Sequence, residues 1–177
     1  MVFVKTIPLQ YKQRCNDYNF EIRTKKEVLM PIRVKTYLQE RGINPSMQRV
    51  AVMHYLLNYF THPTVDEIYS NLSKSMPTLS KTTVYNTLKV LVENGAALQL
   101  TIDEKNTRYD GNTHPHAHFI CLGCGKVHDV EGVNLAAVDK TDHKGLQITE
   151  TQVYYKGYCE ECQKELTNRL IGESTNR

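Results

Sequence analysis

The sequence predicts an α+β protein with two domains and a polar N-terminal extension. Residues 31–95 contain four stretches of helical periodicity, and residues 96–110 contain two short stretches typical of strands. Beyond Asp110 the pattern favours strands and includes two C-x-x-C pairs. We therefore expect an extension at 1–30, a helical domain with a hairpin at 31–110, and a small α/β domain at 111–177.

The composition is that of a soluble globular chain. Its 177 residues are 40% hydrophobic and 23% charged, enough for one ordinary domain or two small ones. No apolar run approaches the roughly 18 residues of a membrane span. Lys5, Pro8 and Gln10 interrupt the start, where a signal peptide needs an apolar segment. We expect a cytoplasmic protein with reduced thiols and no membrane partner.

Positive charge is concentrated towards the front of the chain. Residues 1–30 carry six Lys and Arg against three acids, and residues 31–95 carry seven against four. Residues 96–177 carry nine against twelve. This asymmetry favours a polyanion-binding front half, although charge by itself is a weak indicator of nucleic acid.

Start and stop residues define the four helices. Pro31 suits a first helical position, and Gly42 suits the position just past a helix end. Ser46 and Ser80 suit N-caps, and Thr64-Val-Asp-Glu67 is a capping box. The expected helices cover residues 31–41, 46–60, 64–76 and 80–95.

The fourth helix has two distinct faces. Val84, Leu88 and Leu91 recur at helical spacing and predict its buried side. An adjoining face combines cations, hydroxyls, an amide and an aromatic ring, formed by Lys81, Thr82, Tyr85, Asn86 and Lys89. Such a mixture suits phosphates and base edges in a DNA groove, but it is also compatible with an ordinary solvated helix face.

A β-hairpin follows this helix. Leu98, Leu100 and Ile102 alternate, the polar segment 103–106 makes a turn, and residues 107–110 return. A series of helices, of which the last carries such a polar face, followed by a β-hairpin is typical of a winged helix-turn-helix. The sequence therefore predicts an N-terminal winged-helix DNA-binding domain.

The second domain is predicted to depend on a metal, because a domain of about 65 residues has a small core. Strands are expected at 116–121 and 126–130 on either side of a turn with two glycines. A helix is expected at about 134–143, a long β-rich run at 146–158 and a last helix at 159–170.

The two C-x-x-C pairs predict structural zinc. Cys121, Cys124, Cys159 and Cys162 supply four thiolates, the number that a closed tetrahedral zinc site uses. Reduced core cysteines or a redox pair are the alternatives. Four cysteines in two turns favour the closed site, which fixes a fold and performs no chemistry. Cys15 stands alone in the extension.

A second candidate set offers nitrogen and oxygen. His116 and His118 lie two apart on an expected strand and so point to the same face. Asp110 and Asp129 lie on neighbouring segments, and His62 begins the third helix of the first domain. A ligand set drawn from both domains would fix their relative angle, and it would suit iron(II), manganese or zinc. Spacing alone leaves open whether H-x-H is a ligand pair.

Enzyme classes that combine H-x-H with C-x-x-C are disfavoured. A zinc deaminase needs a Glu after the H-x pair and a Pro before the C-x-x-C. Here His118 and Ile120 occupy those places. We do not expect an enzyme.

Several motifs together resemble one family. They are H-P-T-V-D-E-I-Y (62–69), S-K-T-T-V-Y-N-T-L (80–88), R-Y-D (108–110), H-A-H-F-I-C-L-G-C-G-K-V (116–127) and C-E-E-C (159–162). In this order they are highly specific, and over about residues 31–170 the chain resembles the ferric uptake regulator superfamily. The resemblance implies a homodimeric winged-helix repressor on palindromic double-stranded DNA, with a dimerisation domain at 111–177, structural zinc and a regulatory iron(II) or manganese(II).

Within the family the chain is most similar to the peroxide-responsive branch. That resemblance assigns the regulatory metal to His62, Asp110, His116, His118 and Asp129. The iron-uptake branch usually has Glu at the two Asp positions, and one of its further His ligands would fall near Thr151. It also carries an H-H-D-H run where this chain has P-H-A-H at 115–118.

The resemblance also implies the DNA contacts Arg49, Lys81, Thr82, Tyr85 and Asn86. The family's T-P-Q-R is Ser46-Met47-Gln48-Arg49 here, so the Arg is kept and the Pro is lost. By resemblance, peroxide reacts at the bound iron, a ligand histidine (His116 or His62) gains oxygen, and the repressor leaves its operator. An iron- or zinc-uptake repressor of the same family is the alternative.

Overall fold

The computed structural model describes residues 31–135, 144–148 and 150–174. The expected extension 1–30, with Cys15, lies outside these ranges, as does the expected helix at 134–143 from residue 136 onward. The described residues form two compact units, 31–115 and 116–174, and each is considered by itself.

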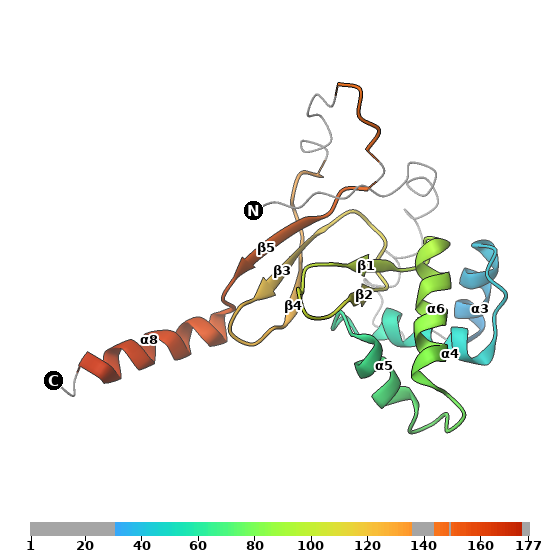
Figure 1. Cartoon of the computed structure of the whole chain (residues 1–177), viewed down its shortest axis with the longest axis horizontal. Coiled ribbons are helices and arrows are strands. Elements are labelled where there is room, and N and C mark those ends of the chain that lie inside the picture. Colours follow the sequence, from blue (N-terminus) through green and yellow to red (C-terminus); the bar gives the residue numbers. More distant parts are fainter. Residues whose placement is uncertain (1–30, 136–143, 149, 175–177) are drawn as a thin grey trace. The chain divides into compact units, whose positions relative to one another are not determined.

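The first unit consists of four helices and a small hairpin (Figure 1). The two strands of the hairpin pair antiparallel, with Leu98 opposite Asp110. This is the expected order of a winged helix-turn-helix, with the hairpin as the wing. The elements are α3 (Pro31–Glu40), α4 (Met47–Asn58), α5 (Val65–Leu72), α6 (Lys81–Glu93), β1 (Leu98–Leu100) and β2 (Arg108–Asp110).

The predicted N-caps are confirmed. The Ser46 side chain accepts the Arg49 N–H, and the Ser80 side chain accepts the Thr83 N–H. Thr64 and Glu67 form a complete capping box, in which each side chain accepts the backbone N–H of the other residue. These side chains satisfy N–H groups that a helix start leaves without intrahelical partners, so the local sequence sets where α4, α5 and α6 begin.

The third helix ends four residues earlier than expected. Helix α5 stops at Leu72, and the chain leaves through a turn in which Met76 N–H donates to the Leu72 carbonyl at 2.9 Å. Pro77 follows this turn, and a proline disfavours the helical conformation for the residue before it, which here is Met76.

One apolar core holds the helices together. Its members are almost inaccessible to solvent and come from all four helices; they include Val34, Tyr37, Met53, Leu56, Ile68, Val84, Leu88 and Leu91. The buried Tyr37 hydroxyl donates to the Ala96 carbonyl at 3.0 Å, which joins α3 to the segment that enters the wing. The predicted buried side of α6 is confirmed, because Val84, Leu88 and Leu91 are each 0% exposed.

The second unit is a three-stranded sheet followed by a helix (Figure 1). Its elements are β3 (Ala117–Cys121), β4 (Val127–Val130), β5 (Val153–Gly157) and α8 (Glu160–Ser174). The strand order is β4-β3-β5, with β4 antiparallel and β5 parallel to the central β3.

The long β-rich run expected at 146–158 is confirmed in its second half and wrong in its first half. Only Val153–Gly157 forms a strand, and residues 146–148 and 150–152 do not. Leu146 and Ile148 are 69% and 40% exposed, so no burial supports their apolar spacing.

No helix within the described ranges has the length and apolar character needed to cross a membrane.

Gly111 is packed where no larger residue fits. A Cβ there would lie 2.9 Å from the backbone carbon and oxygen of Leu56 in α4. Because backbone cannot swing aside, we predict that Gly111→Ala lowers the free energy of unfolding by about 1–3 kcal/mol. Urea denaturation followed by tyrosine fluorescence measures this, since the chain has 11 Tyr and no Trp.

Thr107→Ala, at an exposed position of the wing, is the control and should leave the free energy of unfolding unchanged. Equal stability of the Gly111→Ala variant and the unsubstituted protein would contradict the packing argument.

Candidate metal centres and nucleic-acid interface

The four cysteines of the two C-x-x-C pairs converge in the second unit. Cys121 is the last residue of β3 and Cys124 lies in the turn to β4, whereas Cys159 precedes α8 and Cys162 lies in its first turn. Their sulfur atoms all lie within 4.8 Å of one another. The Sγ atoms of Cys124 and Cys159 are 3.9 Å apart.

Sheet register explains why these sequence-distant cysteines meet. In the parallel pairing Cys121 lies opposite Gly157, and Leu122 N–H donates to the Gly157 carbonyl at 2.6 Å. Cys159 follows two residues later. Gly123 lets the turn approach α8, because a Cβ there would lie 2.7 Å from the Cys162 sulfur. The sequence predicts a turn with two glycines here but does not indicate this close approach.

The electrostatics of the cluster favour a cation. Two backbone N–H groups, first that of Cys159 and then that of Cys124, lower the pKa of Cys121 to about 6. Burial, followed by hydrogen bonds with the other sulfurs, raises the pKa of Cys162 to about 12. Four thiols this close do not all ionise unless a positive charge compensates them.

The dimensions of the cluster fit zinc. Tetrahedral zinc with Zn–S bonds of about 2.3 Å separates its sulfurs by about 3.8 Å. The observed 3.9 Å between two of the sulfurs matches this value. A site with four sulfur ligands has no position for a substrate, so its role is structural.

The second unit also carries an imidazole–carboxylate cluster. His118 on β3 lies directly opposite Asp129 on β4, and His116 immediately precedes β3. Asp129 Oδ1 lies 3.2 Å from His116 Nε2 and 3.8 Å from His118 Nε2. The three side chains are between 3% and 14% exposed, whereas His128, next along β4, is exposed. Strand alternation therefore separates the ligand candidates from their neighbour.

The first unit carries a smaller pair of the same chemistry. His62 Nε2 lies 3.9 Å from Asp110 Oδ2, and the side chains are 2% and 4% exposed. The other oxygen of Asp110 accepts the Asn112 N–H at 2.8 Å. His62 has a φ of +48°, the only positive value for a non-glycine residue among those described. Such a backbone costs about 1–3 kcal/mol and persists only where its surroundings hold it.

Buried imidazoles beside carboxylates suit iron(II), manganese(II) or zinc(II), which accept nitrogen and oxygen ligands. The three residues of the second unit and the two of the first are the five predicted from the sequence. His54, on α4, and His128 belong to neither group.

The predicted DNA-contact face of α6 is exposed. Lys81, Thr82, Tyr85 and Asn86 all lie on the solvent side of the helix. Lys81 is engaged by a partner that sequence reasoning missed, because its Nζ lies 2.7 Å from Asp66 Oδ1 on α5. Arg49, near the start of α4, donates to the Asn44 carbonyl at 2.8 Å. Sequence spacing did not reveal either contact.

The winged helix-turn-helix is followed by a unit with a four-cysteine cluster, and both units carry buried imidazole–carboxylate groups. This combination is that of a metal-responsive regulator. Comparison with known proteins agrees. The model of the ferric uptake regulator family matches residues 40–156. The chain belongs to that family, whose members are transcriptional regulators.

A curated relative supports the assignment, and solved structures share the fold. The chain is 38% identical over 128 residues to a peroxide-responsive repressor, PerR, of Staphylococcus aureus, covering 71% of this chain and 86% of the relative. Its fold is similar to the ferric uptake regulators of Helicobacter pylori (TM-score 0.60, 22% identity, 78% of this chain and 97% of that one) and Vibrio cholerae (0.58, 22%, 71% and 98%). At this identity the two structures support the fold alone.

Replacing one thiolate tests the zinc assignment. We predict that Cys159→Ser lowers the zinc content by about one ion per chain, because three thiolates do not close a structural site. The variant should also unfold at lower temperature, since zinc binding and folding of the second unit are coupled. Metal analysis and calorimetry measure the two effects.

Cys15→Ser is the matched control, because Cys15 belongs to neither C-x-x-C pair. Full zinc content in the Cys159→Ser variant would rule out this cluster as the zinc site.

Proposed function

We propose that this chain is a metal-dependent repressor that binds palindromic double-stranded DNA as a homodimer and is released by hydrogen peroxide. The observation that carries the proposal is the buried pair of imidazoles beside Asp129, in a chain 38% identical to a peroxide-responsive repressor. The zinc held by the four cysteines would keep the second unit folded, and the second unit would carry the dimer contact.

In this proposal one regulatory ion takes ligands from both units. His62 and Asp110 would supply the first unit's donors, and His116, His118 and Asp129 the second unit's. Only five residues separate Asp110 from His116, so the two ligand groups are joined by a short tether. An ion shared in this way stabilises the arrangement of the units in which all its ligands meet, and therefore shifts the population towards it.

The shared ion gives the repressor its response to metal. A winged-helix dimer reads two half-sites, so the spacing of its α6 helices must match the operator. With iron(II) or manganese(II) bound, the fixed arrangement would hold that spacing.

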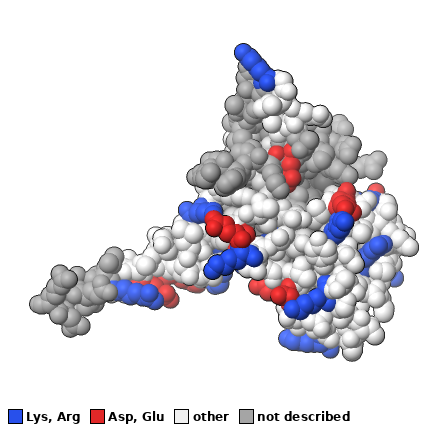
Figure 2. Space-filling view, viewed as in Figure 1, with Lys and Arg blue, Asp and Glu red and all other residues white. Residues whose placement is uncertain are grey.

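The DNA contacts would come from a few individual side chains and not from a continuous basic surface. The face drawn in Figure 2 shows Lys and Arg interspersed with Asp and Glu over the helices rather than gathered in one basic patch. Asp66 would have to release Lys81 when a phosphate takes its place, at little cost because both side chains are more than half exposed. Arg49, Thr82, Tyr85 and Asn86 complete the proposed contact set.

Iron(II), when bound, would react with hydrogen peroxide beside the ligand side chains. In the net change one peroxide oxygen ends on an imidazole carbon of His116 or His62, and the other leaves as water. An oxidised imidazole is a poor metal ligand, so the arrangement that matches the operator is lost. Manganese(II) does not support this reaction, and the manganese form should stay bound to DNA.

Peptide mass spectrometry tests the proposed function. The iron(II)-loaded protein is given a brief peroxide pulse, digested with trypsin and compared with a manganese-loaded sample. We predict one added oxygen on the peptides holding His116 or His62 in the iron sample alone.

The chain contains its own controls for this experiment. His54 shares a tryptic peptide with His62, and His128 lies beside Asp129 on the exposed side of β4, so fragment ions should place no oxygen on either. If bound iron leaves every histidine unmodified, peroxide sensing is refuted and a metal-uptake repressor of the same family takes its place.

The length of the acidic side chain provides a second test. Asp110→Glu adds one methylene to a carboxylate that is 4% exposed, which displaces the oxygen from His62. Since a displacement of about 1 Å can change a rate by about 100-fold, we predict histidine oxidation slower by about 10- to 100-fold. Metal-dependent DNA binding should persist.

The matched control is Asp66→Glu, the same change at a position 70% exposed on α5, for which the oxidation rate should not change. An Asp110→Glu variant that is oxidised as fast as the unsubstituted protein would contradict the assigned role of Asp110.

A further inference from the structure

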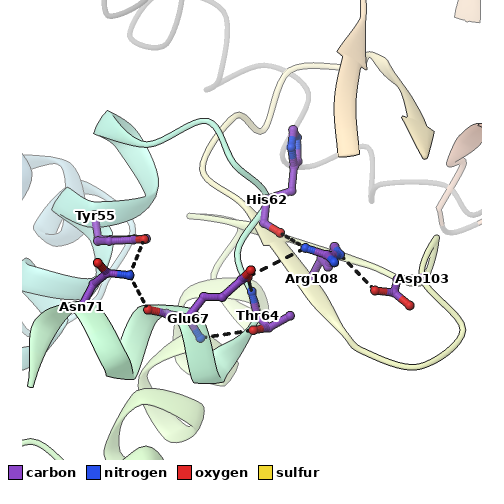
Figure 3. Close-up of polar contacts among 7 residues, drawn as sticks. All are labelled: Tyr55, His62, Thr64, Glu67, Asn71, Asp103 and Arg108. Atoms are coloured by element: carbon purple, nitrogen blue, oxygen red, sulfur yellow. Dashed lines mark hydrogen bonds and ion pairs between the residues drawn. The ribbon is translucent and has the colours of Figure 1, made fainter. Parts of the chain in front are cut away.

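Arg108 joins the wing to the loop that carries His62 (Figure 3). Its Nε donates to Asp103 Oδ2 at 3.1 Å, and its Nη1 donates to the His62 carbonyl at 3.3 Å. The Arg108 and Asp103 side chains are only 14% and 13% exposed. A guanidinium is a rigid fork of donors, so a largely buried one fixes the separation of the groups that it bridges.

The carboxylate of this pair is held in its charged form. Burial by itself raises the pKa of Asp103, but the Lys105 N–H and the Arg108 guanidinium outweigh it and bring the pKa below its ordinary value. The Asp103–Arg108 contact is therefore an ion pair at neutral pH and anchors Arg108 in the wing.

The backbone at His62 is strained and requires contacts that restrain it. This residue is in the left-handed region, and it precedes Pro63, where the backbone is normally extended. Two contacts restrain this segment across the unit: Arg108 donates to the His62 carbonyl, and the Tyr109 N–H donates to the Pro63 carbonyl at 3.0 Å. In Figure 3 the His62 carbonyl faces Arg108 and the imidazole points away from it.

The same guanidinium also reaches α5. Its Nη1 lies 3.8 Å from Glu67 Oε2, the oxygen that closes the capping box with the Thr64 N–H. From Glu67 the contacts continue to α4, because Asn71 Nδ2 donates to both the Glu67 carbonyl (2.8 Å) and the Tyr55 hydroxyl (3.2 Å). The chain of contacts therefore runs from the wing through the His62 loop to two helices of the DNA-binding unit.

We propose that Arg108 is a positioning residue for the regulatory metal: by holding the His62 carbonyl, it keeps the His62 imidazole aimed towards Asp110. Arg108 itself binds no metal. This inference rests on the proposed function, because it takes His62 as a ligand. The inference goes beyond the proposed function because it gives the wing a role in metal affinity.

The expected effect is that of losing a residue that orients a metal ligand. Such losses weaken metal affinity by about 10- to 100-fold. Arg108→Ala should therefore raise the dissociation constant of the regulatory site by at least about tenfold. The dissociation constant of the Arg108→Lys variant should lie between those of the unsubstituted protein and Arg108→Ala. Lysine keeps the positive charge but cannot bridge Asp103 and the His62 carbonyl with a planar fork.

A double-mutant cycle separates positioning from general loosening of the fold. Zinc-loaded protein is titrated with cobalt(II), which binds more tightly than manganese(II) and keeps weakened sites measurable. The four proteins are the unsubstituted chain, Arg108→Ala, His62→Ala and the double variant. Circular dichroism at the titration temperature confirms that each is folded, and the cobalt absorption spectrum reports the ligand geometry.

We predict that Arg108→Ala weakens cobalt binding and changes its spectrum when His62 is present, and does neither in the His62→Ala background. If Arg108→Ala does not fold, Asp103→Asn replaces it in the cycle, with a smaller loss expected in the same direction. An equal loss in both backgrounds would overturn the inference, as would no loss in either. A His62→Ala variant with unchanged cobalt binding would instead remove His62 from the proposed ligand set, and the inference about Arg108 would fall with it.

Discussion

The pairing of β3 with its two neighbours is the constraint on which both candidate metal centres of the second unit depend. The antiparallel register with β4 puts His118 opposite Asp129, and the parallel register with β5 puts Cys121 opposite Gly157. A slip of one residue would turn the two histidines to the other face and carry Cys121 away from Cys159. One five-residue strand thus has the buried imidazoles at its start and the four-cysteine cluster at its end.

The two kinds of candidate centre differ in ligand chemistry and therefore in the role that a bound ion would have. Four sulfur ligands with no open position suit an ion that stays, and they join β3 to α8. Nitrogen and oxygen ligands from different segments suit an ion whose presence varies, and such an ion can report on its surroundings. Within the first unit, the strained His62 is joined to the wing by the guanidinium that holds its carbonyl.

The sequence predicted the features that local chemistry determines. The caps at Ser46, Thr64 and Ser80 are short-range hydrogen bonds, and the C-x-x-C spacing places two sulfurs on one turn by itself. The features that were missed depend on distant partners. Arg108 meets the His62 carbonyl across 46 residues of sequence, and no periodicity encodes such a contact. The coil before Val153 shows that apolar spacing predicts a strand only where the side chains are buried.

The central claim is that one ion takes ligands from both units. Crystals of the manganese(II)-loaded protein, measured on both sides of the manganese absorption edge, test it most directly. The account predicts a single regulatory anomalous peak per chain, within bonding distance of His62 or Asp110 and also of His116, His118 or Asp129. A peak bound by residues of one unit alone, or separate peaks in the two units, would contradict it.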